Sequence, residues 1–162
     1  DSDKILLVSD AGYGFITSIS DLSSKTKNGK AALTLPKNAH VLAPVKVEHM
    51  EKSLLAAITS EGRLLVFPVA ELPELVRGKG NKIINIPSVR AATREEIVCD
   101  VAVLMPDSIL QVHAGRQHLK LKPTDLEHYR GERGRRGNKL PRGYQRVDKL
   151  EVISNKGETI DS

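Results

Sequence analysis

Short apolar segments bounded by turn residues recur along the chain, and the periodicity of a long amphipathic helix is absent. Ile5–Ser9 and Phe15–Ile19 flank a turn that contains two glycines, and Leu54–Thr59 and Arg63–Pro68 flank a turn that contains one. Glycine supplies the positive φ that tight hairpin turns require. The pattern therefore predicts two β-hairpins.

Further strands and helical turns are predicted outside the hairpins. The strands are expected where a short apolar segment precedes a proline or connects one hairpin to the next part of the chain. The additional strands are expected at Ala31–Leu35, Val41–Val47, Ile83–Ile86 and Val147–Ile153. Single helical turns are expected at Ala70–Leu75 and Pro123–Leu126, with one more at the surface within Ser88–Glu96.

The two hairpins are copies of one repeated unit. Residues 5–22 align with residues 55–72 at a constant offset of 50, so that Gly12 matches Gly62, and a looser third copy runs from Val101 to Leu126. A repeat of this size with about four strands is typical of a propeller blade, which buries its apolar face only against neighbouring blades.

We therefore expect an all-β, propeller-like repeat of about three four-stranded blades over residues 1–153, followed by a polar tail at residues 154–162. The repeat units are expected at about residues 1–50, 51–98 and 99–153. Because a closed propeller has typically 4–8 blades, three units predict an incomplete ring. The absence of an initiator Met at Asp1 favours a piece of a longer polypeptide.

The amino-acid composition excludes several classes of protein. The single cysteine, Cys99, excludes an internal disulfide and fits a reducing cytosol, and no apolar stretch approaches the length of a membrane span. The five histidines show no metal-ligand spacing with Cys99 or with one another, and no constellation of catalytic residues is present. We therefore expect no catalytic residue, no metal site, no cofactor and no small-molecule substrate in this chain.

Positive charge is concentrated in one part of the sequence. The net charge is +5, but residues 120–149 hold ten Lys or Arg against four Asp or Glu, so the rest of the chain carries −1. A concentrated positive patch is typical of proteins that bind a polyanion. Aromatic residues make up only 3% of the chain, which disfavours stacking on single-stranded bases and favours contact with the backbone of a duplex.

Small residues and lysine form a loop after each copy of the repeat, at Lys27–Lys30, Lys79–Lys82 and Arg136–Lys139. The last of these lies within the densest basic segment, Gly131–Gly143. Glycine and asparagine let the backbone approach a phosphate closely, while Lys and Arg add charge. Loops of this kind at equivalent positions of a repeat predict one binding surface.

Three segments resemble the C-terminal DNA-binding domain of bacterial type IIA topoisomerase A subunits. They are ILLVSDAGYG at residues 5–14, RGKGNKIINIP at residues 77–87 and GERGRRG at residues 131–137. The resemblance extends to about Ile153 and implies a β-pinwheel, a propeller-like ring with its own strand connectivity. The gyrase branch of this family carries a Gln-Arg-Arg-Gly-Gly-Lys-Gly box that supports DNA wrapping.

That box is present here only in part. Arg135, Arg136, Gly137 and Lys139 match it, whereas Gly134, Asn138 and Leu140 do not. The departures favour the topoisomerase IV branch over a gyrase-type wrapping domain. A protein-interaction propeller that uses its exposed edge strands is the alternative from a different class.

The resemblance implies that this chain binds double-stranded DNA without catalysing a reaction, and that it holds and orients the transported duplex during decatenation and supercoil relaxation. ATP, Mg²⁺, a second A subunit and two B subunits would belong to the parent isomerase, outside this chain. The location implied is the bacterial cytoplasm at the nucleoid, and a peripheral position of the parent enzyme at the inner membrane stays open. The phosphate contacts expected are Lys27, Lys30, Arg77, Lys79, Lys82, Arg133, Arg135, Arg136, Lys139 and Arg142.

Overall fold

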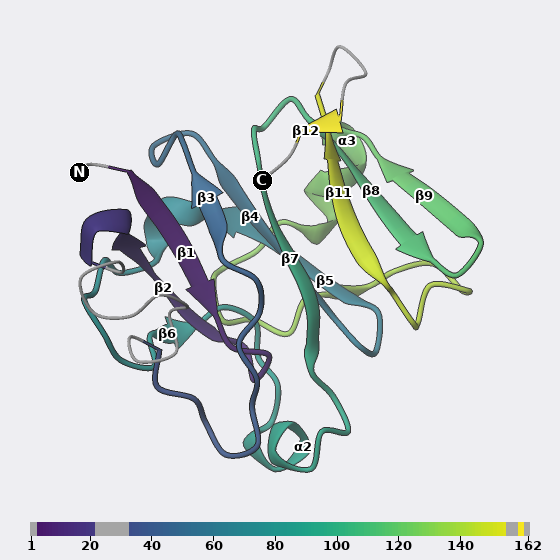
Figure 1. Cartoon of the computed structure of the whole chain (residues 1–162). Helices are drawn as coiled ribbons and strands as arrows, with labels where there is room; N and C mark the ends of the chain where they lie inside the picture. Colours follow the sequence, from purple (N-terminus) through teal and green to yellow (C-terminus); the bar gives the residue numbers. More distant parts are fainter. Residues whose placement is uncertain (1–2, 22–32, 155–158, 161–162) are drawn as a thin grey trace.

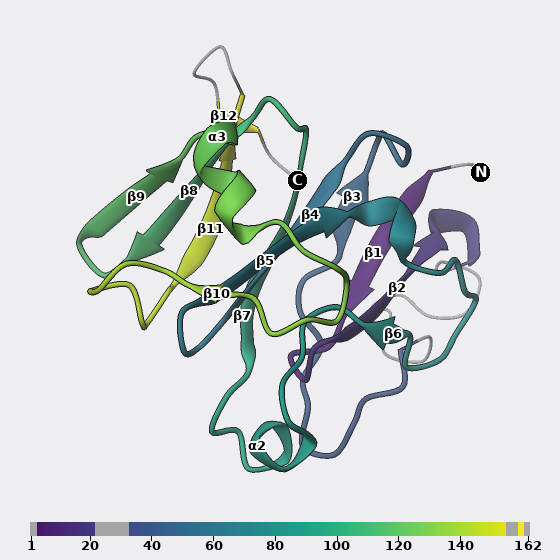
Figure 2. The same cartoon turned by 180° about the vertical axis from the view of Figure 1, so that it is seen from behind.

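Three four-stranded antiparallel sheets stand side by side, with the second between the first and the third (Figures 1 and 2). The computed structural model describes residues 3–21, 33–154 and 159–160. The expected all-β repeat of about three four-stranded blades is confirmed, and the three sheets form an open row.

The strand order of the first sheet is β3-β1-β2-β6, that of the second is β10-β5-β4-β7, and that of the third is β12-β11-β8-β9. The first sheet consists of β1 (Lys4–Val8), β2 (Tyr13–Ser18), β3 (Val45–Val47) and β6 (Asn81–Lys82). The second consists of β4 (Leu54–Thr59), β5 (Arg63–Pro68), β7 (Val98–Leu104) and β10 (Asn138–Lys139). The third consists of β8 (Ile109–Ala114), β9 (Gln117–Leu121), β11 (Lys149–Ile153) and β12 (Thr159–Ile160).

Short helical segments connect the sheets. They are the 3₁₀ turns η1 (Val69–Glu71) and η2 (Glu127–Tyr129) and the helices α2 (Ser88–Ala92) and α3 (Pro123–Leu126). The helical turn expected at residues 123–126 is confirmed with the same bounds. The turn expected at residues 70–75 lies one residue earlier and is shorter.

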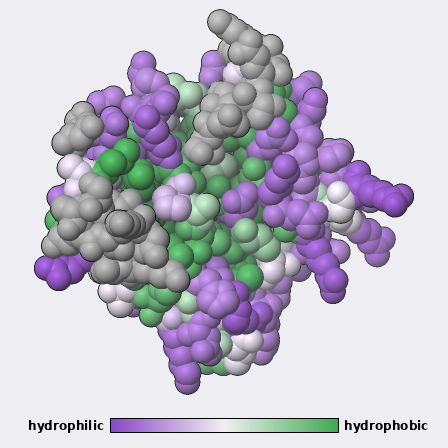
Figure 3. Space-filling view, viewed as in Figure 1, coloured by the Kyte–Doolittle hydropathy of each residue, from purple (hydrophilic) through white to green (hydrophobic). Residues whose placement is uncertain are grey.

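The second sheet is buried on both faces. Leu55 and Phe67 belong to the apolar core shared with the first sheet, whereas Ala56 and Val66 belong to the core shared with the third. All six residues of β4 are buried, which explains why this strand is an almost continuous apolar run. Strand β8, in contrast, alternates between buried and half-buried positions. Apolar residues remain visible between the sheets, while hydrophilic residues cover the ends around α2 and β9 (Figure 3).

Each of the first two sheets receives its last strand from the following repeat unit. Asn81 and Lys82 of β6 pair with Gly14 and Tyr13 of β2. At the equivalent place, β10 pairs with β5 through Asn138 and Lys139. The sequence Gly-Asn-Lys is therefore the strand by which one unit is joined to the unit before it.

Hydrogen bonds continue this exchange directly after each of the two-residue strands. The Ile83 amide donates to the Gly12 carbonyl at 2.7 Å, and the Leu140 amide donates to the Gly62 carbonyl at 2.8 Å. Ile83 is fully buried and Leu140 is nearly so. The apolar residue after each Gly-Asn-Lys sequence thus enters the core.

The strand expected at Ile83–Ile86 is wrong. The strand lies two residues earlier, at β6, and Ile83, Ile84 and Ile86 are buried outside any strand. The expected segments 31–35 and 41–47 are also shorter than predicted, since Leu33 makes only an isolated bridge to Gly78 and the second segment is a strand only from Val45 to Val47. Residues 31 and 32 lie outside the described residues.

Glycine in the Gly-Asn-Lys strands is required by the approach of the strand to its neighbour. Gly80 has φ +84°, and a Cβ there would lie 2.1 Å from the Gly14 carbonyl oxygen. Gly137 has φ +77°, and its Cβ would lie 2.7 Å from the Leu64 carbonyl oxygen. These two glycines are therefore needed for contact with protein backbone, and the expectation that they also open the loops to phosphate stays a prediction.

Replacing Gly80 with alanine should destabilise the fold far more than the same change at Gly115. We expect Gly80→Ala to cost about 3 kcal/mol or more of unfolding free energy, because strain at positive φ adds to a backbone collision. Gly115 also has positive φ but has nothing within 4 Å of its Cβ position, so Gly115→Ala should cost only about 1 kcal/mol. Urea unfolding followed by circular dichroism measures both, and equal losses would contradict the role of close approach.

Candidate nucleic-acid interface

Two basic segments are anchored to the preceding unit at both of their ends. The second basic segment (residues 77–82) begins after the Leu75 amide donates to the Ile16 carbonyl and ends in β6. The third basic segment (residues 131–139) begins where the Gly131 amide donates to the Val66 carbonyl at 3.1 Å and ends in β10. Val66 is the repeat equivalent of Ile16, so the two segments occupy corresponding places.

The second and third basic segments also contact each other directly. The Gly134 amide donates to the Ile83 carbonyl at 2.9 Å, and the Asn85 amide donates to the Arg135 carbonyl at 2.8 Å. The Arg133 guanidinium donates to the Lys82 carbonyl at 2.8 Å. In Figure 2 the chain between α3 and β10 crosses the front of the molecule and reaches the region of β6. Residues far apart in sequence therefore form one surface.

Lys27 and Lys30 lie outside the described residues, and their expected role in phosphate contact stays a prediction. The chain that follows them does meet the second basic segment. The Thr34 amide donates to the Gly78 carbonyl at 2.8 Å, and Leu33 bridges to the same glycine.

Five of the predicted cations are exposed side chains: Arg77, Lys79, Arg135, Lys139 and Arg142. Arg135 is 3.5 Å from Glu132, but both side chains are mostly exposed, so this ion pair adds little stability. The Lys79 ammonium lies 4.5 Å from the centre of the Tyr13 ring, a cation–π contact that directs the charge over β2.

Lys82 and Arg133 are half-buried and help to shape the surface. The Lys82 ammonium donates to the Asn85 side-chain oxygen at 2.6 Å, and Arg133 holds the Lys82 carbonyl. Arg63, which the sequence did not single out, donates to the Gly137 carbonyl at 3.1 Å and lies opposite Lys139 in the sheet. Only the pairing of β5 with β10 brings Arg63 to this surface.

Arg136 occupies a different environment from the other predicted cations. Its two terminal nitrogens donate to the carboxylate of Glu96 at 2.9 and 2.6 Å, and one of them also donates to the Asn85 carbonyl. Glu96 is fully buried. The half-buried Arg136 therefore anchors the third basic segment to a buried carboxylate, and its predicted contact with phosphate stays untested.

Two further charged residues complete the cluster around Glu96. Arg90 of α2 lies 3.6 Å from Glu96 and also pairs with Glu61 at the turn of the second hairpin, and Arg136 is 3.8 Å from Glu61. The cluster of Glu61, Arg90, Glu96 and Arg136 joins α2, the hairpin turn and the third basic segment. Sequence reasoning missed Glu96, because the repeat places no acid at an equivalent position in the first unit.

The cluster sets the ionisation of Glu96. Burial opposes its charged form, but hydrogen bonds from Arg136 and Thr59 and the charges of Arg136 and Arg90 outweigh burial, so the pKa of Glu96 lies below its ordinary value. Glu96 is therefore a carboxylate at neutral pH, and its negative charge is balanced by two guanidinium groups.

Among residues 3–21, 33–154 and 159–160, no group of three or more His, Cys, Asp or Glu side chains is placed to hold a metal ion. No helix in these residues has the length and apolar character needed to cross a bilayer.

Repeated four-stranded sheets that exchange strands define the chain as a propeller-like β-repeat protein. The family described as "DNA gyrase C-terminal domain, beta-propeller" matches residues 3–48 and 54–96. The chain belongs to this family.

Relatives with closely similar sequences are DNA topoisomerase 4 A subunits. The protein from Pseudomonas aeruginosa is 56% identical over 153 residues, and that from Escherichia coli K12 is 51% identical over 154 residues. These matches cover 94% and 95% of this chain but 20% of each relative. The chain thus spans about a fifth of the length of these relatives.

Solved structures of related domains have the same fold as this chain. The E. coli ParC C-terminal domain superposes with a TM-score of 0.86 at 49% identity, covering 95% of this chain and 62% of that one. A DNA gyrase A C-terminal domain superposes with a TM-score of 0.74 at 14% identity, covering 95% of this chain and 50% of that one, and supports the fold alone.

Glu96 should make the stability of the domain depend on pH. A carboxyl with a lowered pKa in the folded state contributes stability that is present above its unfolded pKa and is lost as the pH falls through the folded pKa. Acidification below the ordinary value of 4.5 should therefore destabilise the wild-type chain. Glu96→Gln should be less stable at pH 7 and should lose less stability on acidification.

Urea unfolding at a series of pH values measures this effect, with Glu132→Gln as the matched control. Glu132 is exposed, so its loss should change stability by less than about 0.5 kcal/mol at any pH. Parallel pH profiles for the wild type and Glu96→Gln would contradict the assignment.

Proposed function

We propose that this chain is a non-catalytic module that binds the backbone of double-stranded DNA. The observation that carries the proposal is the surface formed by the second and third basic segments. Two equivalent loops from successive units are anchored in the same way, are joined by backbone hydrogen bonds and present exposed Lys and Arg side chains together.

The chemistry of this surface favours contacts with phosphate. Lysine and arginine contact phosphate oxygens through charge-assisted hydrogen bonds. The backbone amides of Ile83, Asn85 and Gly134 are occupied by protein carbonyls, so charged side chains would make most of the contacts. Such binding is weakly dependent on base sequence and strongly dependent on salt.

In the complete protein we expect the module to hold and orient the transported duplex for strand passage. This expectation rests on the family and on similarity to topoisomerase 4 A subunits. ATP hydrolysis, the Mg²⁺-dependent cleavage of DNA and the contacts with a second A subunit and two B subunits would belong to other parts of the enzyme. Decatenation and supercoil relaxation, in the bacterial cytoplasm at the nucleoid, would be activities of that whole.

DNA affinity should fall steeply as salt rises. If Arg77, Lys79, Arg133, Arg135, Lys139 and Arg142 each neutralise one phosphate, log affinity should fall against log salt with a slope of about −5. Fluorescence anisotropy with a short labelled duplex measures the slope. Removing Lys79, Arg135 and Lys139 together by alanine substitution should bring the slope to about −2 to −3, since each contact contributes about 1.

The matched control replaces three exposed lysines outside the two basic segments, Lys46, Lys52 and Lys149, with alanine. It removes the same charge and should leave the slope within about 1 of the wild type. A flat salt dependence of the wild-type chain, or equal effects of the two triple variants, would exclude this surface.

Arg135 and Arg136 are adjacent in sequence but should respond differently to alanine substitution. Arg135→Ala should weaken binding to any duplex by about fivefold near 0.15 M salt, the value of one phosphate contact, and should leave stability unchanged. Arg136→Ala should lower the unfolding free energy by about 2 kcal/mol, because the buried Glu96 carboxylate loses its main partner. Fluorescence anisotropy measures the DNA affinity of both variants, and urea unfolding measures their stability. A loss of binding confined to one DNA sequence would argue against contact with the DNA backbone.

A further inference from the structure

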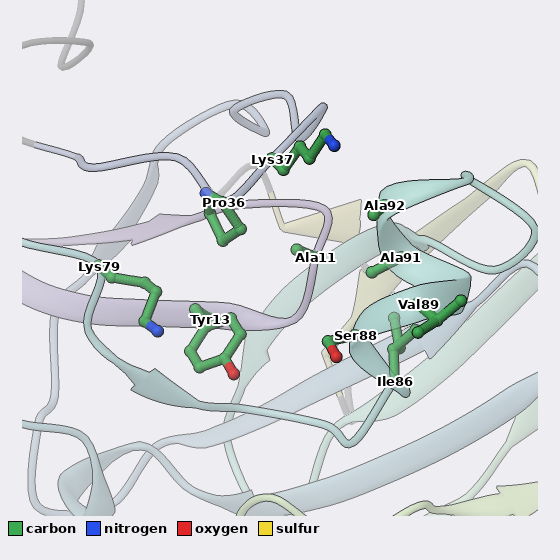
Figure 4. A pocket seen from close by; sticks show the side chains of 10 residues that line it. All are labelled: Ala11, Tyr13, Pro36, Lys37, Lys79, Ile86, Ser88, Val89, Ala91 and Ala92. Carbon is green, nitrogen blue, oxygen red and sulfur yellow. The ribbon is translucent and has the colours of Figure 1, made fainter.

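A cavity of about 380 Å³ lies beside the second basic segment and shares only Lys79 with the proposed phosphate surface. Four separate parts of the chain enclose it (Figure 4): the turn of the first hairpin, the Pro36–Lys37 turn, Lys79, and the segment from Ile86 through α2. Its volume falls within the range of ordinary ligand pockets.

The walls of this cavity are mainly apolar, whereas its charged groups have one sign. Ala11, Ile86 and Ala91 are buried residues of the wall, and the Tyr13 ring lines it on the side of Lys79 (Figure 4). Lys37 and Lys79 are the charged members of the lining, and among the described residues around the cavity none contributes a carboxylate to its wall. The site thus favours a ligand that combines an apolar group with negative charge.

One exposed apolar side chain lines the cavity, and another lies next to its lining in the sequence. In the described part of the chain, the large apolar residues with exposed side chains are Leu35, Val76 and Val89, at 38%, 44% and 72% exposure. Val89 lines the cavity and Leu35 precedes the lining residue Pro36, whereas Val76 lines a separate pocket with Lys4 and Glu74. Apolar residues that gather around one pocket mark an interaction site, whereas scattered ones do not.

We propose that this cavity receives an acidic polypeptide segment of a partner protein, with one apolar side chain inserted between Tyr13 and α2 and flanking carboxylates near Lys37 and Lys79. A polypeptide fits better than a small molecule, because the exposed Leu35 next to Pro36 adds apolar surface beyond the cavity itself. Duplex DNA has no comparable apolar group on its backbone and would leave these walls uncovered.

Lys79 belongs both to this site and to the proposed phosphate surface. An acidic segment bound in the cavity would therefore compete with DNA for the Lys79 charge. Direct binding of the segment does not depend on DNA binding, so the two proposals can fail separately.

The test uses a fluorescein-labelled synthetic peptide in which glutamates flank a central Leu-Phe-Leu sequence, and a control peptide with Ser-Ser-Ser at the centre. Anisotropy titration with the full chain should show tighter binding of the first peptide by about tenfold, because only its apolar side chains enter the cavity. Excess duplex DNA should displace it.

Variants of the chain locate the site. Val89→Glu changes an exposed residue of α2 and should lower the affinity for the Leu-Phe-Leu peptide by about tenfold, because the new carboxylate repels the acidic peptide. Lys37→Ala should lower the same affinity by about threefold, because an attractive charge is lost. Lys46→Ala removes an exposed lysine elsewhere and should change affinity by less than about twofold. Equal binding of the two peptides, or unchanged affinity in both Val89→Glu and Lys37→Ala, would overturn the proposal. Tighter binding of the Leu-Phe-Leu peptide than of the control peptide, with no binding of DNA, would refute the proposed function and leave this site standing.

Discussion

The fold depends on a strand exchange in which two short Gly-Asn-Lys strands complete the sheets of the preceding units. Each exchanged strand makes only a two-residue ladder, but the apolar residue that follows it is buried and donates a further hydrogen bond to the preceding turn. Backbone groups at the outer edges of β2 and β5 are thereby paired rather than left open, which removes two edges at which other chains could pair. Gly80 and Gly137 permit this contact because a side chain at either position would collide with the neighbouring strand.

This exchange also builds the candidate interface. Because each basic segment is held at both ends by the unit before it, its cations are presented at a defined place. Contacts between Ile83 and Gly134, and between Asn85 and Arg135, then join the two segments into one surface. The cluster around Glu96 adds a buried ionic contact that fixes the third segment to α2. The positive charges of Arg90 and Arg136 thus help to hold the surface in shape.

The sequence predicted the parts of this arrangement that are local. Leu54–Thr59 and Arg63–Pro68 form strands with the expected bounds, because short apolar segments around a glycine turn specify a hairpin without help from the rest of the chain. The basic segments were recognised from the same repeat. The structural role of each glycine and each arginine could not be predicted. Gly80 was expected to open a loop to phosphate, and Arg136 was expected to contact phosphate as Arg135 does. Their partners, Gly14 and Glu96, are distant in sequence.

An all-β repeat with concentrated positive charge follows from the sequence alone, since apolar periodicity, turn residues and net charge are properties of neighbouring positions. Only the tertiary structure decided which unit supplies β6 and β10, that β4 is buried on both faces, which cations remain exposed and where a cavity opens beside Lys79. The physical reason is that strand pairing, charge neutralisation and pocket walls all arise from contacts between distant residues, and a single sequence records no such contact.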